Sequence, residues 1–517
     1  MKKKLILALV LIILSLLAYV NIQMVYNFAG RFIYPLDDAY IHLSMAKNFA
    51  EFGTWGITQY EFSSTTSSPL YTFLLAVLIK VFGNWEYIPL VINGLAGVAL
   101  LYVFHLYLRP FSWMTHAIVL GAVLLLMPLQ LMIMIGMEHV CHALVMVLTL
   151  LAFRRYLEDK TPRRFSNLAL VAIVAVGFRY ESLFIILFIC IYLFFIRRDY
   201  VISIALGILA LLPVLVYGYI SVDNGSFFLP NSLILKGNNS AGISGFLERV
   251  AGNLTRALSV LFLFSILVYR FFSGSKTSSG FPSKMKSNPV VFVVIGGFIG
   301  HLLFANFGWL IRYEAYLVVV VIFALIPMVE ELVTRKNSST LLKYGVVMLV
   351  LFTFTLRFVM HIRKQSLASK NIFDQQIQMA DFLKKNYNDA WVIANDIGAI
   401  TYFTNIHLFD TYGLGTAEVA KLRKDDHGSF GVNKKLTDYI QKSTADYDIA
   451  VVYDSWVKLP DGLSKAGSWT IKDNYICGSP TVSFYSIRKA NLPELERNLT
   501  MFRSAMPKDI TIKINKR

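Results

Sequence analysis

Two adjacent carboxylates, Asp37 and Asp38, follow the first long apolar run of the chain and open an amphipathic stretch over residues 39–52. A carboxylate pair can act as a general base, hold a metal ion or simply be solvated in a loop. Their apolar neighbours Pro35 and Leu36 favour partial burial over simple solvation. Burial and mutual repulsion would raise one pKa towards a range useful for proton abstraction. The pair is therefore a candidate catalytic site.

Other unusual ionisable and polar residues stand at the ends of apolar runs rather than in their middles. They are Glu138 with His139, Arg179 with Glu181, Asn231 followed by Lys236, and Arg312 with Tyr313 and Glu314. Each residue by itself is equally compatible with a side chain that reaches from a helix end to the membrane interface. Together they place Arg and Lys beside acids on one predicted face, and Arg binds phosphate in bidentate fashion. A phosphate-binding surface is the hypothesis that accounts for the whole set.

The composition indicates a membrane protein with a soluble part. Of the 517 residues, 56% are hydrophobic and 16% are charged, against roughly 25% charged in soluble domains. Apolar runs near the length of a bilayer span continue to about residue 360, and beyond it they shorten and charges become regular. We therefore predict a membrane domain over residues 1–360, with a first outer loop at 27–87, and a soluble domain over residues 361–517.

The net charge of +17 does not indicate nucleic-acid binding. Most of the surplus Lys and Arg lies in short loops between apolar runs, where membrane proteins keep basic residues on the cytoplasmic side. The three cysteines are too scattered for a disulfide framework or a zinc site.

The same charge bias sets the predicted topology. Residues 70–82 are apolar but short, and treating them as interfacial rather than spanning places all the large basic loops inside. About eleven spanning helices result, with the C-terminal domain outside the cytoplasm of a multi-pass cell-membrane protein. The predicted spans are 5–26, 88–108, 113–135, 139–153, 165–178, 182–196, 200–222, 252–272, 289–307, 314–333 and 340–360.

The soluble domain is predicted to be α/β. Strands are expected at 391–394, 407–409 and 448–452, and helices at 375–386, 396–403 and 434–442. Asp396 and Asp410 lie where they would cap helices or turns, rather than act on a substrate.

An ordered set of short motifs runs through nearly the whole chain and resembles one family. The motifs are Asp37-Asp38-Ala39-Tyr40-Ile41, the Ser64–Leu70 segment, Gly136-Met137-Glu138, Phe178-Arg179-Tyr180-Glu181, Leu229-Pro230-Asn231-Ser232 with Lys236, Arg312-Tyr313, and Asn395-Asp396-Ile397-Gly398-Ala399 with Asp410 and Gly413-Leu414. They are similar to motifs of the GT-C superfamily of polyprenyl-phosphate-sugar-dependent glycosyltransferases, within its arabinofuranosyltransferase-like branch. Tyr180 and Ser182 depart from the Arg-Pro-Glu-Gly element that the branch often has at that place.

The resemblance implies an inverting transfer of a sugar from a polyprenyl-phosphate donor to a glycan, lipid or protein acceptor outside the cytoplasm. Asp37 is the implied base, and Asp38 would orient the acceptor or stabilise the sugar. The implied ligands of the leaving phosphate are Arg179, Lys236 and Arg312. The implied substrate-binding set also includes Tyr40, Asn231 and Tyr313. In this set, Glu138 and Glu181 bind sugar hydroxyls or hold the arginines in place. Apolar walls between the spans bind the isoprenoid tail, beside the membrane lipids.

Some alternatives stay open at this point. No cofactor is expected, and a divalent metal on Asp37, Asp38 and Glu138 is possible but not required by the spacing of the carboxylates. A flippase or transporter of lipid-linked sugars is the main alternative function, and it predicts ionisable residues near mid-membrane. A polymerase or ligase that uses lipid-diphosphate glycans would need a large late outer loop, and a scaffold protein leaves the outer acids and bases unexplained.

Overall fold

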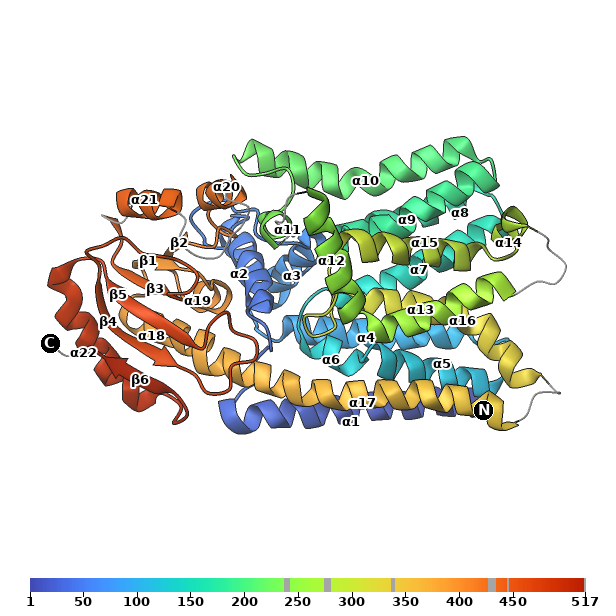
Figure 1. Ribbon diagram of the computed structural model, residues 1–517, viewed down its shortest axis with the longest axis horizontal. Helices are drawn as coiled ribbons and strands as arrows, with labels where there is room; N and C mark the ends of the chain where they lie inside the picture. The colour runs from blue at the N-terminus through green and yellow to red at the C-terminus, as the bar shows by residue number, and fades with distance from the viewer. Residues whose placement is uncertain (237–241, 274–279, 336–339, 426–433, 444–445, 516–517) are drawn as a thin grey trace. The chain divides into compact units, whose positions relative to one another are not determined.

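The computed structural model describes residues 1–236, 242–273, 280–335, 340–425, 434–443 and 446–515 (Figure 1). The chain divides into two compact units, each built from three separate segments. The first unit contains Met1–Asn21, Leu90–Val216 and Phe246–Arg363, and the second contains Ile22–Pro89, Tyr217–Gly245 and Lys364–Arg517. The second unit therefore brings residues of the predicted first outer loop together with the C-terminal region. The predicted boundary at residue 360 stays a prediction.

The first unit is helical. Its segments include most or all of α1 (Lys2–Ala29), α4 (Ile88–Tyr107), α5 (Trp113–Leu126), α6 (Leu129–Met134), α7 (His139–Glu158), α8 (Pro162–Phe178), α9 (Ser182–Ile191), the π-helical turn Tyr192–Ile196, α10 (Tyr200–Asp223), α12 (Gly242–Arg256), α13 (Leu258–Ser273), α14 (Phe281–Ser287), α15 (Pro289–Phe304), α16 (Ala315–Thr334) and part of α17 (Thr340–Ile372). Among the described residues, five helices are long and apolar enough to cross a membrane, or up to seven if each of two bent helix pairs is one span. The chain is thus a multi-pass membrane protein, and the count of eleven spans stays a prediction.

Several predicted spans differ in detail from the observed helices. The predicted span 113–135 is interrupted, because α5 ends at Leu126 and α6 begins only after Pro128, which has no backbone N–H to donate. The predicted span 252–272 begins before a bend of 87° between residues 256 and 258. The final predicted span, 340–360, is shorter than α17, which has 33 residues.

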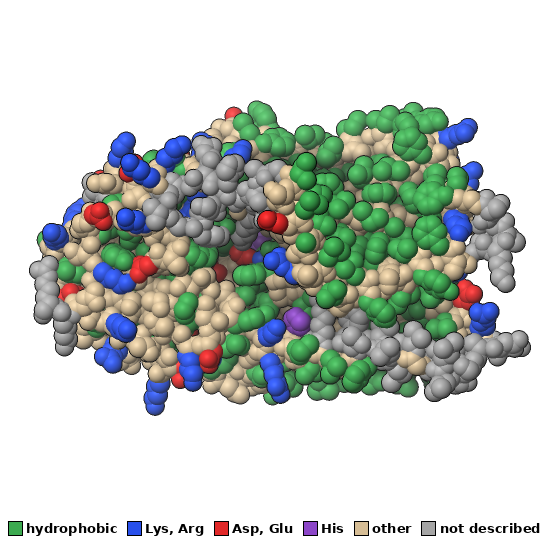
Figure 2. All heavy atoms as spheres, in the orientation of Figure 1, with side chains coloured by type: hydrophobic (Ala, Val, Ile, Leu, Met, Phe, Trp, Pro, Cys, Tyr) green, Lys and Arg blue, Asp and Glu red, His purple; other side chains and the backbone are tan. Residues whose placement is uncertain are grey.

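The surface of the first unit suits a lipid environment. Figure 2 shows hydrophobic side chains gathered over α10 and the neighbouring helices, and Val201 and Ile208 on α10 are both exposed. An apolar surface of this extent is rare on soluble monomers and typical of membrane contact.

The second unit combines short helices with one sheet. Its elements are α2 (Asp37–Phe52), α3 (Pro69–Phe82), α11 (Asn231–Lys236), the π-helical turn Phe373–Ile377, α18 (Gln378–Asn386), β1 (Trp391–Ala394), α19 (Gly398–Phe403), β2 (His407–Asp410), α20 (Ala417–Asp425), α21 (Lys434–Ser443), β3 (Ile449–Val452), β4 (Ser464–Thr470), β5 (Thr481–Ser486), α22 (Leu492–Phe502) and β6 (Thr511–Ile514). The sheet has the order β2-β1-β3-β5-β4-β6. Strands β2, β1 and β3 are parallel, and β5, β4 and β6 continue the sheet in antiparallel fashion.

Helices cover both faces of this sheet. Ile393, Ala450 and Val452 pack with Val419 of α20 and Ile440 of α21 in one hydrophobic core. Val451 is paired with Phe484, and because side chains alternate along a strand, both point to the opposite face. There Phe484 packs with Phe382 of α18, whose ring also contacts Phe502 of α22. The parallel strands that carry the predicted polar residues are therefore fixed from both sides.

Candidate functional site

The first carboxylate of the pair, Asp37, is a buried anchor of the second unit. Gly398 donates its backbone N–H to Asp37 Oδ2 at 2.6 Å, and Ala399 donates to Asp37 Oδ1 at 2.8 Å. These N–H groups begin α19 and have no partner within that helix, so a carboxylate satisfies them. The backbone approaches closely, since a Cβ on Gly398 would lie 2.2 Å from the Asp37 carbonyl oxygen. Asp37 consequently ties the start of α2 to the start of α19.

A second carboxyl group, that of Asp396, faces Asp37 through a side-chain hydrogen bond. Gln376 Nε2 donates to Asp396 Oδ2 at 2.5 Å, and the Tyr453 hydroxyl lies 2.8 Å from the same oxygen. Burial, together with the charge of Asp396, raises the pKa of Asp37 well above its ordinary value, and burial also raises the pKa of Asp396. The two carboxyls therefore retain a shared proton to a higher pH than a solvated Asp would.

The second carboxylate of the motif, Asp38, differs from Asp37 in its exposure. Asp37 is 9% exposed, whereas Asp38 is partly exposed. Tyr40 is fully buried, its hydroxyl accepts a hydrogen bond from the backbone N–H of Tyr34, and its ring lies 5.7 Å from that of Phe403. Tyr40 thus belongs to an aromatic cluster that packs α2, and Asp38 is the more accessible of the two carboxylates.

Asn231 lies at a junction of three of the motifs. Its backbone N–H donates to the carbonyl of Ser64 at 2.8 Å, and its Nδ2 donates to the carbonyl of Leu414 at 3.1 Å. The Leu414 carbonyl also accepts from the Thr65 hydroxyl at 2.9 Å. Asn231 is buried, so its amide holds these segments together. Lys236 ends α11, and its side chain lies outside the described residues.

Asp410 has the capping role that its sequence context predicts. Its carboxylate accepts the backbone N–H groups of Tyr412 and Gly415, each at 2.8 Å. Burial raises the pKa of Asp410 to about 6. For Asp396 the expected capping role is wrong, since its carboxyl instead contacts Asp37, Gln376 and Tyr453.

The first unit has its own polar cluster, centred on Arg179 at the end of α8. The guanidinium binds Glu181 in bidentate fashion, with Nη2 2.5 Å from Oε1 and Nε 3.1 Å from Oε2, and its Nη1 contacts Glu138. Arg179 is 5% exposed and Glu138 is fully buried. Despite the cost of burial, Arg179 lowers the pKa of Glu181 to about 2. Arg179, Glu138 and Glu181 therefore form a buried ionic group.

Arg312 and Tyr313 lie beside this ionic group. Arg312 Nη2 donates to the Tyr313 hydroxyl at 3.1 Å, and Arg179 lies over the Tyr313 ring at 5.7 Å. Arg312 follows three residues with positive φ, namely Trp309, Leu310 and Ile311. Left-handed backbone costs roughly 1–2 kcal/mol per residue for side chains other than glycine. The surrounding structure must therefore hold this strained turn, which presents Arg312 to the cluster.

The predicted site residues thus fall into two groups, one in each unit. Asp37, Asp38, Tyr40 and Asn231 lie in the second unit, and Glu138, Arg179, Glu181, Arg312 and Tyr313 lie in the first. Within the described part of the chain, no three His, Cys, Asp or Glu side chains are grouped so as to hold a metal ion. The need for a metal stays an open prediction.

Three residues around the carboxyl pair were not predicted as site residues from the sequence: Gln376, Asp396 and Tyr453. Asp396 belongs to one of the motifs, but nothing in the local pattern distinguishes a carboxyl that faces Asp37 from one that caps a turn. Gln376 and Tyr453 carry no sequence signal of this kind, because their relation to Asp396 arises only from the packing of the sheet and the π-helical turn.

Comparisons with known proteins bear on the fold. A family model described as a domain of unknown function, DUF8728, matches residues 370–485. No curated protein gives a significant sequence match. Solved structures do match over nearly the whole chain.

ArnT from Cupriavidus metallidurans bound to undecaprenyl phosphate has 13% sequence identity and a TM-score of 0.53, covering 93% of this chain and 98% of that chain. The apo oligosaccharyltransferase of Archaeoglobus fulgidus has 11% identity and a TM-score of 0.51, covering 98% of this chain and 76% of that one. The oligosaccharyltransferase AglB from Archaeoglobus fulgidus, in complex with an inhibitory peptide and a dolichol-phosphate, has 13% identity and a TM-score of 0.50. The match covers 94% of this chain and 74% of that one. The fold of this chain is that of the GT-C glycosyltransferases.

Proposed function

We propose that this protein is a membrane glycosyltransferase that moves a sugar from a polyprenyl-phosphate donor to a glycan, lipid or protein acceptor outside the cytoplasm, with inversion. The observation that carries the proposal is the carboxylate pair at the start of α2, in which Asp37 is anchored and Asp38 is partly exposed. The GT-C fold supports it, since ArnT and AglB of that fold are seen with undecaprenyl phosphate and dolichol-phosphate. The protein would lie in the cell membrane with its C-terminal region outside the cytoplasm.

The geometry favours Asp38 over Asp37 as the general base. Both oxygens of Asp37 already accept backbone N–H groups, and its carboxyl shares a proton with Asp396. A base must reach the proton that it removes, and a carboxyl occupied in this way is poorly placed to do so. Our proposal therefore exchanges the two roles expected from the sequence: Asp38 takes the proton, and Asp37 fixes the first turn of α2.

The proposed reaction is a single displacement. Asp38 accepts the proton of the acceptor hydroxyl while that oxygen forms a bond to the anomeric carbon of the donor sugar. The bond from this carbon to the phosphate oxygen breaks, and polyprenyl phosphate leaves with the electron pair. General-base assistance contributes typically ~10²–10⁴-fold, so positioning and charge stabilisation of the leaving phosphate must supply the rest.

Arg179 and Arg312 are proposed as ligands of that phosphate, and Lys236 is the third residue for which the resemblance implies this role. An arginine has five N–H donors, and the bonds to Glu138 and Glu181 engage three of those on Arg179. Two donors are left for a phosphate oxygen. Glu138 and Glu181 accordingly act as positioning residues that hold the guanidinium, rather than as ligands of the sugar. The proposal requires no metal ion.

The test is transfer of radiolabel from membrane-extracted polyprenyl-phosphate sugars, with wild type, Asp38→Asn and Asp37→Asn at matched expression. We expect transfer to fall by the contribution of a general base, ~10²–10⁴-fold, in Asp38→Asn. Asp37→Asn should keep more activity and lose stability. The exposed Asp461→Asn is the matched control.

Full activity in both variants of the pair would contradict the assignment of the base to this motif. Greater loss in Asp37→Asn at unchanged stability would return the base to Asp37. If wild type transfers no label but moves labelled lipid across the bilayer, the protein is a flippase.

A further inference from the structure

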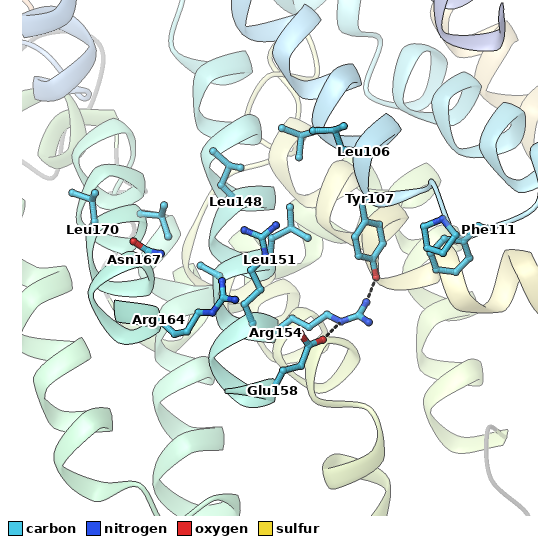
Figure 3. Close-up of a pocket in the computed structure, with 15 residues that line it drawn as sticks. Leu106, Tyr107, Phe111, Leu148, Leu151, Arg154, Glu158, Arg164, Asn167 and Leu170 are labelled. Atoms are coloured by element: carbon cyan, nitrogen blue, oxygen red, sulfur yellow. Dashed lines mark hydrogen bonds and ion pairs between the residues drawn. The ribbon is translucent and has the colours of Figure 1, made fainter. Parts of the chain in front are cut away.

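A cavity of about 650 Å³ lies in the first unit, away from the ionic group around Arg179. It opens between the C-terminal ends of α4 and α7 and the first turns of α8. Leu106, Leu148, Leu151 and Leu170 form part of an apolar wall (Figure 3). The volume is in the range of small-molecule and lipid sites, ~300–1,000 Å³.

The other part of the cavity lining is cationic. Arg154, Arg155 and Arg164 all line it, against one acid, Glu158. Arg154 is already engaged, since its Nε donates to Glu158 at 3.1 Å and its Nη1 contacts the Tyr107 hydroxyl (Figure 3). Within the described ranges, the guanidinium groups of Arg155 and Arg164 have no hydrogen-bond or ion-pair partner. The cavity thus holds two cations that are not neutralised by the protein.

The combination defines the chemistry of a ligand. An amphiphile with an anionic phosphate head would neutralise Arg155 and Arg164, and its chain would cover the leucine wall. Arginine is suited to phosphate because it offers paired N–H donors. The helix ends that carry these arginines belong to the face that the charge bias predicts to be cytoplasmic. Basic pockets between helices on that face suit acidic lipid head groups.

We propose that this cavity binds the phosphate head group of an anionic phospholipid of the cytoplasmic leaflet. Arg155 and Arg164 bind the phosphate, Asn167 lies beside them in the lining, and one acyl chain runs along the leucine wall. The Arg154–Glu158 pair, linked to Tyr107, keeps α7 and α4 at the spacing that forms the cavity. The site is independent of the proposed glycosyl transfer.

The experiment measures lipid binding to purified full-length protein by native mass spectrometry. The probes are phosphatidylglycerol and phosphatidylcholine with the same acyl chains, and inorganic phosphate alone. The variant is Arg155→Gln with Arg164→Gln. Its control is Arg163→Gln with Arg197→Gln, which removes the same charge from exposed residues that do not line the cavity.

We expect phosphatidylglycerol to bind the variant at least about tenfold more weakly than wild type, and the control within about twofold of wild type. Arg155→Lys with Arg164→Lys keeps the charge but loses the paired N–H donors, so its binding should fall between that of wild type and that of the Gln variant. Equal loss in the control variant, or equal binding of phosphatidylcholine to wild type, would overturn the site. Inorganic phosphate that binds as tightly as the lipid would overturn the lipid assignment. The readout needs no sugar transfer, so it is unaffected if the proposed function fails.

Discussion

Gly398 donates its backbone N–H to the Asp37 carboxylate at 2.6 Å, although 361 positions separate the two residues. The contact joins the first residue of α2 to the first residue of α19. It also explains why position 398 is glycine, since the Asp37 backbone occupies the place of a side chain. The proposed catalytic helix is therefore held by the C-terminal part of its own unit.

Replacing Gly398 by Ala should separate the two helix starts. The added Cβ would lie 2.2 Å from the Asp37 carbonyl oxygen and 2.7 Å from its Oδ2, so the backbone must move. Overpacking of this kind costs ~1–3 kcal/mol, and we expect a lower melting temperature together with reduced transfer. Thermal unfolding in detergent checks this. The control is Gly121→Ala, at a helical glycine where an added Cβ would meet no heavy atom within 4 Å, and this substitution should be neutral or slightly stabilising. An unchanged melting temperature in Gly398→Ala would contradict the close contact.

The shared proton between Asp37 and Asp396 should make stability depend on pH. Both pKa values are raised above the ordinary value of 3.8, so this stabilisation is fully present below 3.8 and is lost as pH rises through the raised values. Asp396→Asn replaces the shared proton by an amide N–H, and the side-chain oxygen of the new asparagine can still accept the hydrogen bond from Gln376. We therefore expect a flatter pH dependence of melting temperature in this variant as the pH rises above 3.8.

Asp396→Ala should be less stable than Asp396→Asn, because alanine offers no hydrogen bond to the polar partners of the carboxyl. Leaving a buried polar group without a partner costs ~1–3 kcal/mol of folding stability. Asp461→Asn, at an exposed position, should leave the pH profile of wild type unchanged. If Asp396→Asn keeps the full pH dependence, the shared proton is not its source.

The Leu414 carbonyl should couple Thr65 and Asn231 energetically, because it accepts from both side chains. Thr65→Val or Asn231→Ala leaves the Leu414 carbonyl with one side-chain donor and should lower the free energy of unfolding by ~1 kcal/mol. The double variant leaves the carbonyl without either side-chain donor, so we expect a loss greater than the sum of the two. A double-mutant cycle on unfolding free energy measures this, and Thr65→Val with the distant Asp461→Asn should be additive within ~0.5 kcal/mol. Additivity in the first cycle would refute the coupling.

Arg179 should be the residue of its ionic group whose loss is most damaging. Arg179→Met leaves Glu138 and Glu181 as buried acids without their common partner, and breaking a buried pair costs ~3–5 kcal/mol. Adding Glu138→Gln and Glu181→Gln should recover much of this stability but not the transfer activity. Thermal unfolding of Arg179→Met and of the triple variant decides the point, with the exposed Arg163→Met as control. A triple variant no more stable than Arg179→Met would show that charge imbalance is not the cause.

The sequence predicts much of the fold where the physical signal is local. Long apolar runs mark helices such as α4 and α16, and the buried strands β1 and β3 are predicted within a residue. The break at Pro128 has a local cause that the length of the apolar run conceals. Strands β4, β5 and β6 were missed because their polar residues, such as Ser464 and Lys465, give no continuous apolar run.

The site is predictable only in part. Asp37 and Arg179 stand out because charged residues beside apolar runs are rare, but their partners depend on tertiary structure. The acidic neighbour Glu181 is two positions from Arg179, whereas Asp396 is far from Asp37 in the sequence and meets it only in the tertiary structure. The difference in burial between Asp37 and Asp38 likewise depends on α19, which no pattern around residue 37 reveals.

The junction at the Leu414 carbonyl has a consequence for biosynthesis. Thr65 and Asn231 leave the ribosome long before residue 414, and at ~5–20 residues per second the first of them waits roughly 20–70 s for its acceptor. During that interval, the segment around Thr65 lacks the partner that completes its hydrogen bonds. The second unit can therefore complete this junction only after residue 414 has been synthesised, and truncation before Leu414 would leave Thr65 and Asn231 without their common acceptor.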